Sequence, residues 1–132
     1  METASTRVLT CVLADDHDAV RSAVRSQLDR LPWVAVGAEA RCGEEALEHI
    51  LQLEPDVAIV DVRMPRGSGF EVCAAVRERG LPTHVILYSA LAEPENMKLG
   101  LEVGATAFVA KDMGFPALRV ELERLLAVVH AD

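Results

Sequence analysis

The feature that most constrains this fold is a short apolar run that ends in an acid. Residues 57–60 read Val-Ala-Ile-Val, with Pro55 before them and Asp61 and a Pro/Gly-rich loop after them. A continuous apolar run of this length, bounded by turn signals, predicts a strand buried on both faces. Asp61 then stands at the carboxyl end of that strand, the edge where open parallel sheets bind ligands. A carboxylate there can serve as a nucleophile, a metal ligand or a helix cap.

The remainder of the chain alternates strand and helix patterns. Strands are predicted at residues 8–14, 33–40, 57–60, 85–89 and 107–110, and helices at 18–31, 44–53, 69–79, 93–104 and 115–130. Five strands alternating with five helices predict an α/β fold, in which a doubly wound, five-stranded parallel sheet lies between two helical layers. No linker or internal repeat interrupts the pattern, so we interpret residues 1–132 as one domain.

The first predicted helix carries a regular apolar stripe. Val20, Val24 and Leu28 recur at helical spacing and are expected to face the core. Arg21 is expected on the opposite, outer side. Asp18, at the start of the pattern, is the residue type that caps a helix N-terminus, and we expect it to be the N-cap.

Composition excludes several function classes. A net charge of -8 makes the chain a poor nucleic-acid binder by itself, because it would repel phosphates. The three cysteines have no pairing or metal spacing and are expected to be free thiols in a reducing cytosol. No apolar run approaches the ~18 residues of a membrane span. We therefore expect a cytoplasmic location and no membrane anchor.

Polar side chains gather where the predicted strands end. Asp15 and Asp16 follow the first strand, Asp61 the third, Ser89 the fourth and Lys111 the fifth. If the sheet has the doubly wound order 2-1-3-4-5, the first and third strands are neighbours, and the three carboxylates would converge and repel one another. Lys111 and a hard divalent cation, normally Mg²⁺, would offset that repulsion. With donors from Ser89 and Lys111, such a site suits a phosphoryl group.

These segments resemble a known family. Residues 13–17, 60–65, 88–90 and 107–111 are similar to the corresponding strand ends of the receiver domain of two-component response regulators, which is CheY-like. The resemblance runs from Val8 to about Val128 and implies a flavodoxin-like fold with sheet order 2-1-3-4-5. In the region of residues 107–113 it is closest to the NarL/FixJ (LuxR-type) subfamily, because Asp112 stands where the family most often has proline.

The resemblance implies a metal-dependent phosphoacceptor. Asp61 matches the aspartate whose carboxylate takes the phosphoryl group of a histidine kinase. Asp16 matches the direct ligand of Mg²⁺, for which Mn²⁺ can substitute, and Asp15 the acid that holds the metal mainly through water. The backbone carbonyl of Arg63 matches the group that completes the coordination.

It also implies a switch. Lys111 matches the lysine that pairs with the carboxylate and later with a phosphoryl oxygen. Ser89 matches the hydroxyl that moves toward the phosphoryl group, and Phe108 the aromatic residue that turns inward with it. The expected result is a regulated surface rather than an enzyme, with self-catalysed phosphotransfer and slow autodephosphorylation as the only reactions.

The implied partners follow from the same family. A sensor histidine kinase would supply the phosphoryl group, and a homodimer is a second candidate partner after phosphorylation. DNA would be contacted only through a helix-turn-helix output domain, which full-length NarL/FixJ members carry and these 132 residues do not contain. Whether the chain is whole or part of a longer protein stays open.

Three alternatives are less consistent with these residues. A haloacid dehalogenase-type hydrolase needs an acid at position 63, where this chain has arginine. A flavin or nucleotide module needs a first loop rich in small residues, whereas Asp15 and Asp16 would repel phosphate. A phosphorylation-independent pseudo-receiver would lack Asp61, one of the other acids or Lys111, and none is missing. We do not interpret His17 as a phosphohistidine, because it lies in a loop beside three acids.

Overall fold

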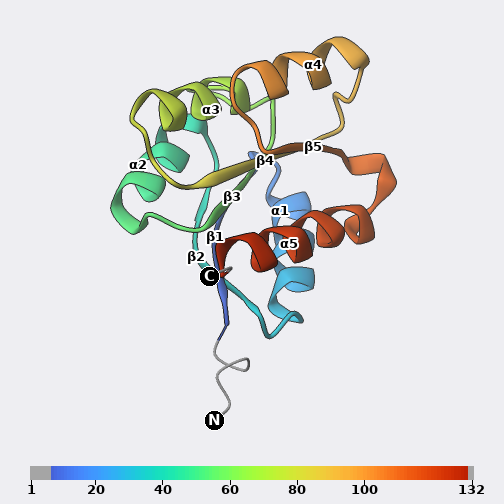
Figure 1. Cartoon of the computed structure of the whole chain (residues 1–132). Helices are drawn as coiled ribbons and strands as arrows, with labels where there is room; N and C mark the ends of the chain where they lie inside the picture. Colours follow the sequence, from blue (N-terminus) through green and yellow to red (C-terminus); the bar gives the residue numbers. More distant parts are fainter. Residues whose placement is uncertain (1–6, 131–132) are drawn as a thin grey trace.

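The computed structural model describes residues 7–130 and contains one five-stranded sheet with helices on both faces (Figure 1). The strands are β1 (Leu9–Ala14), β2 (Val34–Ala40), β3 (Val57–Val60), β4 (His84–Ser89) and β5 (Ala107–Ala110). The helices are α1 (Asp18–Asp29), α2 (Gly43–Leu53), α3 (Gly69–Glu78), α4 (Pro94–Glu102) and α5 (Phe115–Val129), with a short 3₁₀ helix, η2 (Lys111–Met113), after β5. All neighbouring strands are parallel and their order is β2-β1-β3-β4-β5. The predicted flavodoxin-like fold is confirmed.

Two cores lie on opposite faces of the sheet. Helices α1 and α5 cover one face, where Leu13 of β1 meets Leu28 of α1 and Leu122 of α5. Helices α2 and α3 cover the other, where Val12 of β1 lies in the same core as Ile50 of α2. Because successive side chains of a strand point to opposite faces, one strand supplies both cores.

β3 is buried on both sides, as its sequence predicts. All four of its residues are buried, with Val57 and Ile59 in the core under α1 and α5, and Ala58 and Val60 in the other. The central position of β3, between β1 and β4, explains why it needs no polar side chain. It also places Asp61 in the middle of the sheet edge.

The start of α1 differs from the sequence prediction. The N-cap is His17, and Asp18 is the first helical residue, so the prediction of an Asp18 cap is wrong. The Asp18 carboxylate instead accepts a hydrogen bond of 2.8 Å from Arg21, one turn further along. Arg21 is also not on an outer surface, since only 11% of its side chain is exposed. Val20 is exposed (36%), so its predicted place in the core is wrong, whereas Val24 and Leu28 are buried as predicted.

The loop after β3 is held by the start of α2. The backbone amide of Glu44 donates to the carbonyl of Arg66 at 2.8 Å, and that of Gly43 to the carbonyl of Pro65 at 3.3 Å. Gly43 lies so close to Gly67 that a Cβ added to it would be 2.1 Å from the Gly67 carbonyl oxygen. This contact fixes the height of the loop above the sheet edge.

A capping box then starts α3. The Ser68 hydroxyl accepts from the amide of Glu71 at 3.2 Å, and the Glu71 carboxylate accepts from the amide of Ser68 at 2.8 Å. The three cysteines are free and buried, which agrees with the prediction of free thiols. Within residues 7–130, no helix combines the length and apolar character needed to span a membrane.

Candidate functional site

The predicted site residues meet at the carboxyl edge of the sheet. Asp15 and Asp61 each follow directly on the last paired residues of neighbouring strands, Ala14 of β1 and Val60 of β3. The Asp61 amide continues this ladder by donating to the Ala14 carbonyl at 3.0 Å, and the Asp15 amide donates to the carbonyl of Ala40 in β2 at 3.0 Å. The backbone itself therefore places the two carboxylates side by side, and both are buried.

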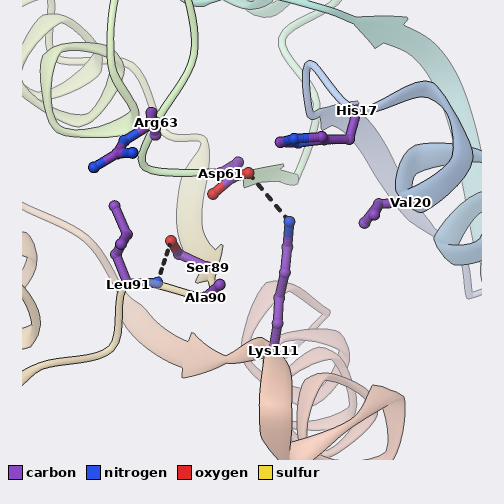
Figure 2. Close-up of a pocket in the computed structure, with 8 residues that line it drawn as sticks. All are labelled: His17, Val20, Asp61, Arg63, Ser89, Ala90, Leu91 and Lys111. Carbon is purple, nitrogen blue, oxygen red and sulfur yellow. Dashed lines mark hydrogen bonds and ion pairs between the residues drawn. The ribbon is translucent and has the colours of Figure 1, made fainter.

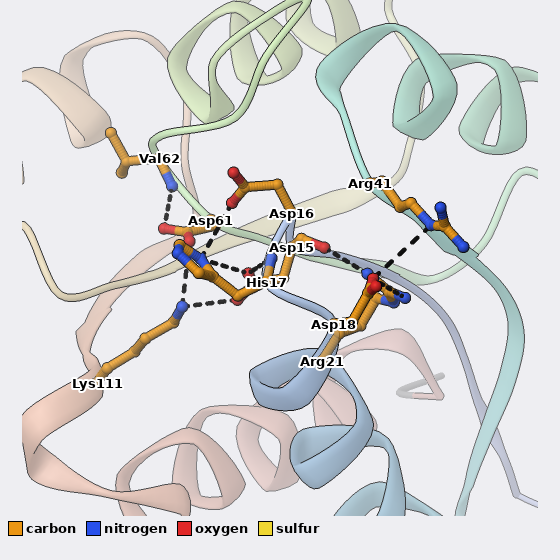
Figure 3. Close-up of polar contacts among 9 residues, drawn as sticks. All are labelled: Asp15, Asp16, His17, Asp18, Arg21, Arg41, Asp61, Val62 and Lys111. Atoms are coloured by element: carbon orange, nitrogen blue, oxygen red, sulfur yellow. Dashed lines mark hydrogen bonds and ion pairs between the residues drawn. The ribbon is translucent and has the colours of Figure 1, made fainter.

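Lys111 joins these carboxylates from the end of β5. Its Nζ donates to Oδ2 of Asp15 at 2.6 Å and to Oδ2 of Asp61 at 3.1 Å (Figure 3). Burial alone would lower the pKa of Lys111, but the hydrogen bonds and charges of Asp15 and Asp61 outweigh it and raise that pKa above its ordinary value. The ammonium group therefore stays charged between the two acids.

The other carboxylate oxygens of this pair have backbone partners. Oδ1 of Asp61 accepts from the amide of Val62 at 2.7 Å, and Oδ1 of Asp15 accepts from the amide of His17 at 2.9 Å. Both side chains are thus held in fixed orientations. Such fixed orientation is needed for a carboxylate that must meet a reacting atom.

Asp16 behaves differently from the other two acids. Its side chain is 31% exposed, yet its Oδ1 atom is buried and accepts no hydrogen bond from the described residues. Nδ1 of His17 lies 3.2 Å from this oxygen and 3.5 Å from Oδ1 of Asp15. A buried carboxylate oxygen without a donor is costly, and a cation would satisfy it.

The residues present therefore fit a divalent cation. Asp15, Asp16, His17 and Asp61 each offer one ligand atom, and these four atoms lie within 4.8 Å of one another. Three carboxylates against one lysine leave an excess of negative charge. Oxygen ligands of this kind are those that Mg²⁺ prefers, with water completing its coordination.

A cavity of about 280 Å³ opens beside Asp61. Its lining residues are His17, Val20, Asp61, Arg63, Ser89, Ala90, Leu91 and Lys111 (Figure 2). Ser89, at the end of β4, is buried, and its Oγ accepts from the amide of Leu91 at 3.0 Å. The Ser89 hydroxyl keeps its own hydrogen for a group in the cavity, because it serves only as acceptor in that contact.

The remaining predicted site residues are Arg63 and Phe108. Arg63 is exposed and lines the cavity from the loop after β3. Phe108 is not among the lining residues; it is partly buried under α4, and a Cβ added to Gly100 would lie 3.0 Å from its ring. The structure thus brings together all the predicted site residues except Phe108, which contacts the helix next to the site.

Sequence reasoning missed the contribution of Arg21. Its guanidinium donates to the backbone carbonyl of Asp15 at 2.8 Å, to Asp18 at 2.8 Å and to Glu39 of β2 at 2.9 Å. Burial opposes the charge of Arg21, but the hydrogen bonds to Asp18 and Glu39 raise its pKa. The only sequence signal was an arginine at i+3 from Asp18, since Glu39 is far away in the chain.

Comparisons with known proteins agree on one family. Residues 11–123 match the response regulator receiver domain family. The nitrate/nitrite response regulator protein NarL of Escherichia coli is 31% identical over 121 residues, which cover 92% of this chain and 53% of NarL. A protein-glutamate methylesterase/protein-glutamine glutaminase of Geobacter sulfurreducens is 39% identical over 105 residues, covering 80% of this chain and 28% of that enzyme.

A solved structure gives the same picture. The signal receiver domain of NarL from Mycobacterium tuberculosis superposes with a TM-score of 0.85 at 38% identity, covering 90% of this chain and 97% of that domain. This chain is thus similar in extent to a receiver domain alone, and it spans about half the length of the NarL protein it matches.

Proposed function

This chain belongs to the response regulator receiver domain family, and on that premise we propose that Asp61 accepts a phosphoryl group from a sensor histidine kinase. The observation that carries the proposal is the position of Asp61, which is buried at the centre of the sheet edge, paired with Lys111 and open to a cavity of about 280 Å³. A bond forms between an Asp61 carboxylate oxygen and phosphorus. The phosphorus–nitrogen bond of the kinase phosphohistidine breaks, and the histidine nitrogen keeps the electron pair.

We assign the metal to the acids around Asp61. Asp16 would hold Mg²⁺ or Mn²⁺ directly through its unpartnered oxygen, Asp15 mainly through water, and Asp61 and the backbone carbonyl of Arg63 would complete the protein ligands. The bound cation would neutralise charge between the carboxylates and the equatorial oxygens of the transferred group. Lys111 would supply a further positive charge and hydrogen bond to that group.

We assign the switch to Ser89 and Phe108. The Ser89 hydroxyl is positioned to donate to a phosphoryl oxygen in the cavity without losing its contact with the Leu91 amide. Phe108 packs close to Gly100 of α4, so a change in the conformation of the Phe108 side chain would alter its packing against that helix. A small movement at Ser89 could in this way alter the surface formed by α4, β5 and α5.

Relatives differ in the output attached to the receiver. The similarity to a methylesterase shows that receiver relatives include enzymes, while NarL is a response regulator. We propose that this chain is a single receiver domain that acts as a cytoplasmic switch rather than as an enzyme. Its output would be transcriptional, through a DNA-binding domain of the NarL type, and dimerisation after phosphorylation stays a prediction.

Phosphorylation by acetyl phosphate tests the central assignment. The intact mass of the wild type is expected to rise by one phosphoryl group with Mg²⁺ and not with a chelator, and Asp61→Asn should show no gain. Asp112→Asn, which removes an exposed acid next to Lys111, is the matched control and should be labelled normally. A gain that persists in Asp61→Asn, or a folded wild type that neither acetyl phosphate nor a phosphorylated histidine kinase can label, would contradict the proposal.

A further inference from the structure

Helix α4 is held in the fold by very few buried contacts. Of its nine residues, Pro94–Glu102, Gly100 is the one that is buried. The Gly100 backbone packs tightly against Leu87 of β4 and Phe108 of β5, since a Cβ on Gly100 would lie 2.8 Å and 3.0 Å from their side chains. The larger apolar side chains of α4 are exposed instead: Met97, Leu99 and Leu101. A helix that buries little apolar surface is weakly fixed by the core, so its orientation depends on the polar contacts at its two ends.

The C-terminal end of α4 is attached to α3, the helix next to it (Figure 1). Nη1 of Arg77 donates to the carbonyl of Glu102 at 2.9 Å, while the three preceding carbonyls of α4 accept from backbone amides. The chain then turns over the Arg77 side chain, since a Cβ on Gly104 would lie 3.1 Å from Cδ of Arg77. Helix α3 itself is anchored in the core by Val72 and Val76. This end of α4 therefore has a fixed attachment.

The N-terminal end of α4 is attached to the loop that follows β4. Nδ2 of Asn96 donates to the Leu91 carbonyl at 3.3 Å and to Oε1 of Glu93 at 2.9 Å. Both partners are acceptors, so the side-chain amide is fixed with its nitrogen toward them. On the other side of Leu91, its backbone amide donates to Oγ of Ser89 at 3.0 Å (Figure 2). One residue, Leu91, thus joins the Ser89 hydroxyl to the first turn of α4.

We propose that Asn96 is a positioning residue through which Ser89 moves α4, and that α4 turns about the end held by Arg77. The inference rests on the proposed function, in which Ser89 donates to a phosphoryl oxygen and keeps its contact with the Leu91 amide. Because that contact is kept, Leu91 follows Ser89, and the Leu91 carbonyl draws Asn96 with it. The Arg77 end stays in place, so the displacement becomes a change in the direction of α4 and not a shift of the whole helix.

Residual dipolar couplings test this proposal, because those of the α4 amides report the direction of the helix relative to the sheet. They are measured on the full chain with Mg²⁺, before and after addition of excess acetyl phosphate, and the intact mass verifies labelling. In the wild type we expect α4 to change direction. Asn96→Ala should lose this change, although Asp61 is still phosphorylated and the Leu91 amide resonance still shifts. Asn96→Asp, which keeps the side-chain shape but replaces the donor with an acceptor, should behave like Asn96→Ala.

Two exposed neighbours provide matched controls. Glu95 precedes Asn96 in α4, and Arg79 follows the last turn of α3. Glu95→Ala and Arg79→Ala should both keep the wild-type change in the direction of α4. Arg77→Ala should release the fixed end, so the Val103 amide resonance shifts on phosphorylation in this variant, whereas it stays nearly unchanged in the wild type.

The outcomes separate this inference from the proposed function. If α4 changes direction in Asn96→Ala as in the wild type, or keeps one direction in a phosphorylated wild type, the inference is overturned and Asp61 remains the phosphoacceptor. An unchanged Val103 amide in phosphorylated Arg77→Ala overturns the role of Arg77 as the fixed end. A folded wild type that no donor phosphorylates overturns the proposed function, and the inference falls with it. Asn96 and Arg77 lie outside both cores, so no loss of fold is expected, and circular dichroism verifies this.

Discussion

The ammonium group of Lys111 donates a hydrogen bond of 2.6 Å to Asp15. It therefore lies closer to the proposed metal-holding acid than to the proposed phosphoacceptor, Asp61, at 3.1 Å. One positive charge is shared between the two functions of the site. A cation that binds Asp15 must compete with this lysine for the same carboxylate.

Replacing Lys111 by alanine should lower the stability of the metal-free protein without weakening its affinity for Mg²⁺. Mg²⁺ affinity is expected to be unchanged or severalfold tighter, because the competing charge is gone. The metal-free protein should lose about 1–3 kcal/mol of unfolding free energy, since two buried carboxylates lose their partner. Mg²⁺ should restore more stability to this variant than it adds to the wild type, as measured by urea unfolding with and without the ion.

Lys98, the other lysine of the chain, provides the matched control. It is exposed on α4, and Lys98→Ala should change neither Mg²⁺ affinity nor stability measurably. A clear loss of Mg²⁺ affinity in Lys111→Ala would show that the lysine supports the metal site instead of competing with it.

Arg21 is expected to position the proposed metal ligands through the backbone. Its hydrogen bond to the Asp15 carbonyl ties the loop of Asp15 and Asp16 to the network with Asp18 and Glu39. Arg21→Ala should lose about 1–3 kcal/mol of stability and weaken Mg²⁺ binding severalfold. Arg21→Lys should recover only part of both, because a single ammonium cannot reproduce the planar arrangement of donors.

The neighbouring Arg25 provides a control that shows whether Arg21 positions the proposed metal ligands or only stabilises the fold. It donates to Glu39 at 2.8 Å and to Asp29 at 2.9 Å, and within residues 7–130 it makes no hydrogen bond to Asp15. Arg25→Ala should therefore lower stability while Mg²⁺ affinity remains that of the wild type. Equal losses of Mg²⁺ affinity in both arginine variants would assign Arg21 a purely structural role.

The sequence was sufficient for the parts of this structure that depend on local pattern. The apolar run of β3 predicts burial on both faces, and parallel strand order then requires that Asp15 and Asp61 meet at one edge. Lys111 is predictable for the same reason, as the residue after β5. The convergence of these side chains needs only the strand ends and their order.

Contacts between distant residues could not be predicted in this way. Periodicity placed Arg21 on an outer surface, but Glu39 of β2 and the Asp15 carbonyl lie within its reach and draw the guanidinium inward. The same network explains the Asp18 error, because the carboxylate that could cap α1 is engaged by Arg21. The position of a residue in a helix sets the direction in which its side chain leaves the backbone. A long side chain such as that of arginine can still turn toward tertiary partners on another side.

Alkaline pH should destabilise the protein through its buried thiols. Burial raises the pKa of Cys11 from 9.0 to about 12, outweighing the nearby charge of Arg25, and burial raises that of Cys73 to about 12. Above pH 9 the unfolded chain releases these protons while the native state retains them. Their contribution to stability is thus complete below pH 9 and is lost as pH rises toward 12.

Urea unfolding measured across that pH range provides the test. Cys11→Ala should show a shallower decline of unfolding free energy with pH than the wild type, by an amount on the order of a few kcal/mol over the range. The comparison uses the pH slope and not the absolute stability, because the smaller side chain also leaves a cavity. Identical slopes would mean that the Cys11 thiol ionises as readily in the native state as in the unfolded one.

The contact between Gly43 and Gly67 should couple α2 to the proposed metal site. A Cβ on Gly43 would lie 2.1 Å from the Gly67 carbonyl oxygen, so Gly43→Ala must displace the loop that carries Arg63. We expect a loss of about 1–3 kcal/mol in stability and weaker Mg²⁺ binding, because the Arg63 carbonyl moves with the loop. Gly37→Ala is the control, since its Cβ would meet Leu53 at an ordinary 3.4 Å. If Gly43→Ala is destabilised but binds Mg²⁺ like the wild type, the Arg63 carbonyl does not contribute to the metal site.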